Sequence, residues 1–114
     1  MLPKIAVIQG LYFLLTGIWP IVHIESFLMV TGPKVDLWLV KTVGVLVAVI
    51  GAVLLSASRS RRITNEIVLL AVGSALGLAI IDVVYARRIS PVYLADAAAE
   101  LGLVALWAVG RARV

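Results

Sequence analysis

A short stretch near the C-terminus places three side chains that could move protons on one face of a helix. In YLADAAAELG, residues 93–102, Tyr93 precedes Asp96 by three residues and Glu100 follows it by four. Residues at these spacings share a helix face. Two carboxylates one turn apart in an apolar setting repel each other, so at least one is expected to be protonated at neutral pH. Such a pair suits general acid–base chemistry.

A second set of polar side chains follows the first apolar segment at spacings of three and four residues: Gln9, Tyr12, Thr16, Trp19 and His23. This stripe could line a site, or it could pack helices together, because polar side chains also join helices within membranes. Pro20 lies within the stripe and cannot donate a hydrogen bond to the carbonyl of Thr16, so a kink or a locally opened backbone is expected there.

The composition indicates that lipid must surround these groups. The 114 residues are 63% hydrophobic and 14% charged, whereas soluble domains are nearer half apolar and a quarter charged. A chain this short cannot bury such an excess. Cys is absent, which excludes disulfides and thiolate metal sites.

Four apolar segments are each long enough to cross a bilayer, which takes about 20 residues. They cover residues 5–30, 37–57, 63–86 and 91–110. Gly32 and Pro33 predict a helix stop, and Ser90 with Pro91 predicts a helix start, with Ser90 as N-cap and Pro91 at the first helical position. Short links make neighbouring helices antiparallel. We therefore predict an all-α, integral membrane, antiparallel four-helix bundle that forms a single domain over residues 1–114.

Basic residues favour one orientation. Six lie on the side of the termini and four on the other: Lys4, Arg59, Arg61, Arg62, Arg111 and Arg113 against Lys34, Lys41, Arg87 and Arg88. The positive-inside rule places both termini in the cytoplasm, in a bacterial-type inner membrane. The bias is modest, so dual topology is left open.

The polar groups of the outer half are expected to meet, because spans one and three end where spans two and four begin. We assign Glu100 and Asp96 as acid and base and add Asp82 and His23 to the catalytic set. Six residues are expected to bind the ligand: Lys41, Tyr85, Tyr93, Trp19, Tyr12 and Trp38. The alternative is that charges near helix ends are interfacial anchors or ion-pair partners. Glu100 is too deep and too short for that role.

Other site types find little support. A single His without a second ligand at metal-binding spacing predicts no metal, and no cofactor motif is present. No basic aromatic surface suggests nucleic acid. Glycines instead predict close helix contacts, within the bundle or between protomers: Gly10 and Gly17, Gly44 and Gly51, and Gly73 and Gly77.

The run GLYFLLTG, residues 10–17, is bounded by glycines and contains aromatic residues. It resembles the first helix of the DoxX-like group of small four-helix membrane proteins, and the layout of the whole chain is similar to theirs. The group is functionally mixed, so the resemblance implies the fold and no particular activity.

Three functions remain open on these grounds. The first is a pocket that binds or converts a small lipophilic molecule, such as an isoprenoid, quinone or sterol-like compound, by acid–base chemistry. The second is a proton-coupled transporter that acts as a homodimer, because four spans leave little room for alternating access. The third is an accessory membrane subunit without a ligand. Membrane lipid is the expected partner in all three.

Overall fold

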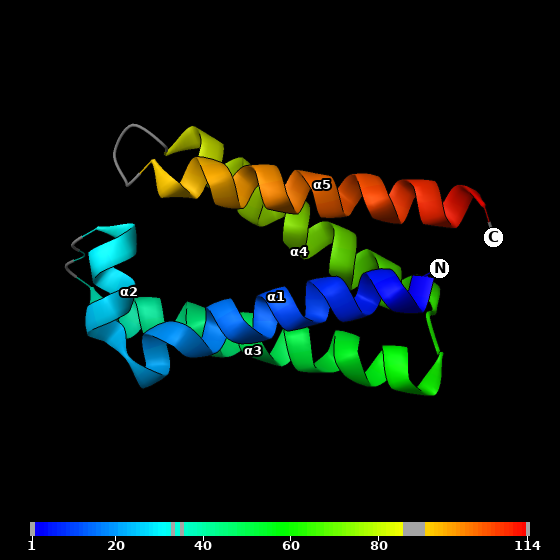
Figure 1. Cartoon of the computed structure of the whole chain (residues 1–114), viewed down its shortest axis with the longest axis horizontal. Helices are drawn as coiled ribbons and strands as arrows, with labels where there is room; N and C mark the ends of the chain where they lie inside the picture. Colours follow the sequence, from blue (N-terminus) through cyan, green and yellow to red (C-terminus); the bar gives the residue numbers. More distant parts are fainter. Residues whose placement is uncertain (1, 33, 35, 86–90, 114) are drawn as a thin grey trace.

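The computed structural model describes residues 2–32, 34, 36–85 and 91–113. These residues form five α-helices and no strand: α1 (Leu2–Val22), α2 (Ile24–Thr31), α3 (Leu37–Ser60), α4 (Asn65–Val84) and α5 (Val92–Ala112). Four of them, α1, α3, α4 and α5, are long and apolar enough to cross a membrane. Successive long helices run in opposite directions, and both termini lie at one end (Figure 1). The predicted all-α bundle is confirmed.

The first predicted span is not one kinked helix but two helices. Pro20 lacks an amide hydrogen, and α1 ends two residues later, at Val22. His23 then caps a new helix, because its Nδ1 accepts a hydrogen bond from the Ser26 amide at 3.2 Å. The short helix α2 therefore turns away from the axis of α1, toward α5 (Figure 1). The disruption expected at Pro20 therefore takes the form of a break between two helices, because this cap begins a second helix at the bend.

The other helix ends follow the predictions more closely. Gly32 ends α2 with a positive φ of 94°, and its amide bonds the Leu28 carbonyl at 2.8 Å. Pro91 precedes the first residue of α5 instead of occupying it. The remaining predicted boundary residues, Pro33, Ser90 and the end of span three at residue 86, fall outside the described residues.

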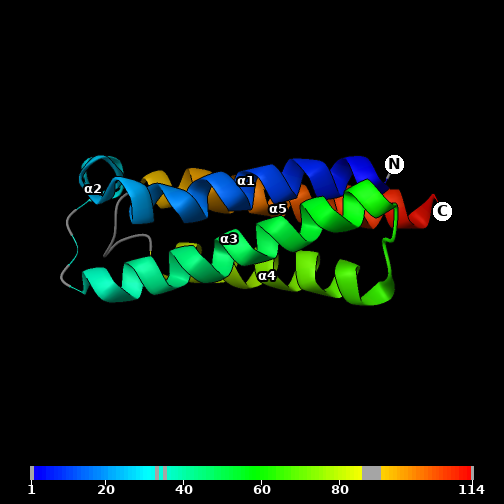
Figure 2. The ribbon, with the colours of Figure 1, turned by 90° about the horizontal axis from the view of Figure 1, so that it is seen from below.

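The helices form two pairs, α1 with α3 and α4 with α5, and these pairs face each other (Figures 1 and 2). In the first pair the backbones touch. A Cβ atom on Gly17 would lie 2.5 Å from the Gly44 carbonyl oxygen, and one on Gly51 would lie 2.6 Å from the Leu14 nitrogen. Glycine is needed there because any side chain would push the helices apart. A Cβ atom on Gly73 or Gly77 would have nothing within 4 Å, so the glycines of α4 make no such contact with the described residues.

The two pairs are joined at the end that carries the termini. A buried cluster fills this end: Ile5, Ala6, Leu54, Ala71 and Trp107. Gln9 crosses it, donating to the Ala71 carbonyl at 2.8 Å and accepting from Trp107 Nε1 at 2.7 Å. This side chain therefore links α1, α4 and α5. With one end packed in this way, the opposite end is where the pairs leave space between them.

Candidate functional site

A cavity of about 640 Å³ lies between the helix pairs at the end away from the termini. Its walls are mostly apolar and include Val43, Val47, Leu78 and Ala99. Cavities of this size and character are typical of sites for small organic ligands, which combine apolar walls with a few fixed polar groups.

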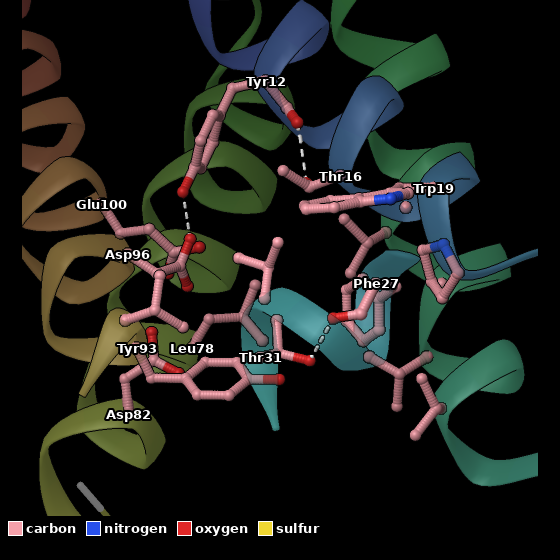
Figure 3. Close-up of a pocket in the computed structure, with 18 of the residues that line it drawn as sticks. Tyr12, Thr16, Trp19, Phe27, Thr31, Leu78, Asp82, Tyr93, Asp96 and Glu100 are labelled. Carbon is pink, nitrogen blue, oxygen red and sulfur yellow. Dashed lines mark hydrogen bonds between the residues drawn. The ribbon is translucent and has the colours of Figure 1, made fainter. Parts of the chain in front are cut away.

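The middle three residues of the polar stripe on α1 face this cavity. Tyr12, Thr16 and Trp19 all line it, as their common helix face predicts. The break after Pro20 adds a further wall, because α2 brings Phe27 and Thr31 to the same space. Phe27 packs edge-to-face on Trp19, with ring centroids 5.4 Å apart. Figure 3 shows these aromatic rings on the side of the cavity opposite Asp96 and Glu100.

The acidic wall consists of Asp82 on α4 and Asp96 and Glu100 on α5, which we call the carboxyl triad. One oxygen from each lies within 4.8 Å of the others. Asp82 is 6% exposed and Glu100 is 2% exposed. Tyr12 reaches across from α1 and donates its hydroxyl hydrogen to Asp96 Oδ1 (Figure 3). The triad and Tyr12 together thus link α1, α4 and α5 at the cavity surface.

Two oxygens of the triad have no hydrogen-bond partner among the described residues, namely Asp82 Oδ2 and Glu100 Oε2. No described Lys, Arg or His makes an ion pair with the triad either. Like charges this close in an apolar wall cannot all remain ionised unless protons or a cation offset them. The triad therefore has acceptor capacity that this part of the protein does not use.

Six of the ten residues predicted for the site lie at the cavity: Asp82, Asp96, Glu100, Tyr12, Tyr93 and Trp19. Four do not: His23, Lys41, Tyr85 and Trp38. The carboxyl groups and Tyr12 converge because α1, α4 and α5 turn those faces inward. The predicted single cluster of all outer polar groups is therefore wrong in part.

Each of these four residues lies outside the cavity for a local reason. His23 is exposed and occupied with the start of α2, where Nδ1 lies 2.7 Å from Ser26 Oγ. Lys41 is also exposed, because it lies about 100° around α3 from Val40, a residue that lines the cavity. Trp38 is 67% exposed and Tyr85, which ends α4, is 43% exposed. Lys41 is the basic residue that the sequence places within a span, which made it the expected partner of Asp96 or Glu100, but it does not reach the cavity that those residues line.

Among the described residues, Lys34 is the basic residue at the cavity, although its position in the sequence indicated only a loop charge. Its Nζ donates to Thr31 Oγ1 at 2.8 Å and to the Gly32 carbonyl at 3.2 Å. The same ammonium lies 5.4 Å from the Phe27 ring centroid and 5.1 Å from that of Tyr93. Lys34 therefore links α2 to α5. The helix break at Pro20 was the available signal, since it turns α2 back over the bundle.

We predict that this link keeps α2 closed against α5. Replacing Lys34 with Met keeps the aliphatic stem but removes the charge and its hydrogen bonds. Each cation–π contact contributes about 0.5–1 kcal/mol, so amide hydrogen exchange over residues 24–31 should be up to about tenfold faster. Hydrogen–deuterium exchange mass spectrometry measures this directly. The exposed Lys41→Met is the matched control, and equal effects from both variants would contradict the assignment.

No protein-family model, curated protein or solved structure matches this chain. The functional assignment therefore rests on the cavity and the carboxyl triad themselves.

Proposed function

We propose that the chain is a multi-pass membrane protein that binds a small lipophilic molecule in the cavity between its helix pairs. One observation carries the proposal: an apolar space of about 640 Å³ has buried carboxyl groups at one wall. An apolar body fits the Val and Leu side of the space, and a polar end fits the triad. Isoprenoids, quinones and sterol-like compounds have this division.

Acid–base chemistry on the bound molecule is the second part of the proposal. Asp96 and Glu100 share a helix face and flank the space, so one can hold a proton while the other accepts one. Tyr12 supports this arrangement by donating to Asp96, which leaves the unpartnered Glu100 oxygen free to contact a ligand. Asp82 adds a third acceptor from α4. These roles would suit isomerisation or epoxide opening.

The proposed setting is a bacterial-type inner membrane with both termini in the cytoplasm. The helices α1, α3, α4 and α5 are compatible with four crossings, and the end with the termini carries Arg59, Arg61 and Arg111. This orientation places the cavity in the outer half of the membrane. Membership of the DoxX-like group belongs to the same proposal, and it supports the four-helix layout only.

Ligand extraction tests the proposed function. The protein is purified in mild detergent, and the organic compounds that co-purify are extracted and quantified per chain by liquid chromatography–mass spectrometry. We expect one lipophilic compound at a stoichiometry near one, falling about tenfold or more in Glu100→Gln, since hydrogen bonds to charged groups contribute about 1.5–3 kcal/mol. The exposed Glu25→Gln serves as control. Equal recovery from Glu100→Gln and the wild type would refute the site.

A further inference from the structure

We propose that the polar end of this ligand is a protonated primary amine, whose three N–H groups bind the three carboxyl groups of the triad. The inference rests on the proposed function, because it assumes a lipophilic ligand in the cavity, and it specifies the chemical class of that ligand. Neither the sequence patterns nor the acid–base assignment requires a cation.

The spacing of the triad fits an ammonium group. A charge-assisted N–H···O bond is about 2.8 Å long, so three acceptors placed tetrahedrally around one nitrogen lie about 4.6 Å apart. The carboxyl oxygens of Asp82, Asp96 and Glu100 lie within 4.8 Å of one another. An ammonium has three donors and no acceptor, and the triad offers one acceptor from each residue. The number and type of the groups therefore match those of an ammonium, and their spacing is compatible with one nitrogen bound to all three.

The unpartnered oxygens point to a missing donor. Asp82 Oδ2 and Glu100 Oε2 are buried without a partner among the described residues, in side chains that are 94% and 98% shielded from solvent. A buried acceptor without a donor is destabilising, because it has given up its hydrogen bonds to water and gained none in return. The cavity is the side from which a ligand can supply those donors, since both residues line it. Two buried acceptors at this wall therefore lack a donor among the described residues.

The protein does not fill this deficit with its own ammonium group. Lys34 is the basic residue at the cavity within the described residues, and its Nζ is held by oxygens of Thr31 and Gly32 instead. One ligand ammonium would offset one ionised carboxylate, and the other two carboxyl groups can accept N–H bonds while protonated. The apolar walls would then contact the hydrocarbon part of the amine.

The rest of the cavity favours an amine over a metal ion. The same oxygen spacing would suit a hard cation, but Mg²⁺ and Ca²⁺ need six or more oxygen ligands and usually keep bound water. One Asp96 oxygen already accepts from Tyr12, and the neighbouring wall residues include Leu78, Ala95 and Ala99, whose side chains cannot hold water. An alkylammonium uses this apolar surface, whereas a hydrated ion does not.

Equilibrium binding of four probes tests the inference. The protein is placed in phosphatidylcholine nanodiscs and titrated with decylamine, decan-1-ol, decanoate and decyltrimethylammonium. Subtracting the binding measured with Glu100→Gln removes simple partitioning into the lipid. We expect decylamine to bind about tenfold or more tightly than decan-1-ol and decanoate. Decyltrimethylammonium should also bind more weakly than decylamine, because it carries the charge without N–H donors. Glu25→Gln should behave as the wild type.

Three outcomes would overturn the inference. Equal binding of decan-1-ol or decyltrimethylammonium would show that the triad does not select N–H donors, while the proposed lipophilic site would stand. Displacement of decylamine by one equivalent of Mn²⁺ from the wild type, but not from Asp82→Asn, would assign the triad to a metal ion. Absence of saturable binding by all four probes would contradict the proposed function as well.

Discussion

Replacing Trp107 with Ala is expected to lower the free energy of unfolding by about 3 kcal/mol or more. The indole is fully buried in the cluster at the end with the termini. Its removal leaves a hole among Ile5, Leu54 and Ala71, and the Gln9 amide oxygen loses the donor at 2.7 Å. Because this cluster joins the two helix pairs, the loss should weaken the whole bundle. Thermal or denaturant unfolding in micelles measures the effect.

Trp38→Ala is the matched control for that experiment. Trp38 is 67% exposed on the outer face of α3, so its removal opens no internal hole and should change stability by less than about 1 kcal/mol. The same variant should leave ligand recovery unchanged, because Trp38 does not line the cavity. Comparable destabilisation by the two variants would contradict the packing described for the two helix pairs.

Replacing Glu100 with Leu is expected to have opposite effects on stability and on binding. The ligand-free protein should become more stable by about 1–3 kcal/mol, because the variant removes a buried oxygen that has no partner. Ligand retention should fall by about tenfold or more, since the substitution also removes an acceptor of the carboxyl triad. Thermal unfolding of delipidated protein and ligand extraction measure the two effects separately.

The outcome separates a binding site from a structural acid. If Glu100 held helices together as in an accessory subunit, Glu100→Leu would destabilise the protein, as Trp107→Ala does. Gln9→Leu provides the comparison, because Gln9 is a buried polar residue whose donor and acceptor are both satisfied. Its loss should destabilise the bundle. Destabilisation by both substitutions would contradict the functional assignment of Glu100.

The helices could be predicted from the sequence because their hydrophobic length is a local property. Residues 37–57 and 91–110 were expected to be helical, and both ranges lie within helical segments except at Pro91. The division at His23 was harder to predict. Pro20 indicated a kink or an opened backbone, but which of the two forms depends on how the freed backbone groups are satisfied. Here the His23 ring caps the amide of Ser26, a contact that spacing alone does not reveal.

Site residues that share one helix face could be predicted from their spacing. Residues whose position depends on how a helix is rotated about its axis could not. Asp96 and Glu100 are fixed relative to each other by their spacing, so their common direction could be predicted. Lys41 depended on which face of α3 turns inward. That face is set by Gly44 and Gly51, which press on α1 and leave Lys41 outside. Lys34 was missed because its place depends on α2 folding back over the cavity.

Native mass spectrometry of variants with a filled and an open cavity tests whether a ligand occupies the space between the helix pairs. Val47 lines the cavity and Val49 does not, although both lie on α3. Val47→Trp fills the space, and Val49→Trp adds the same bulk on an exposed face. After mild extraction, we expect a bound lipophilic molecule on the wild type and on Val49→Trp, and its loss from Val47→Trp. Equal ligand occupancy of Val47→Trp and Val49→Trp would contradict a ligand site between the helix pairs. The same holds if none of the three proteins carries a bound molecule.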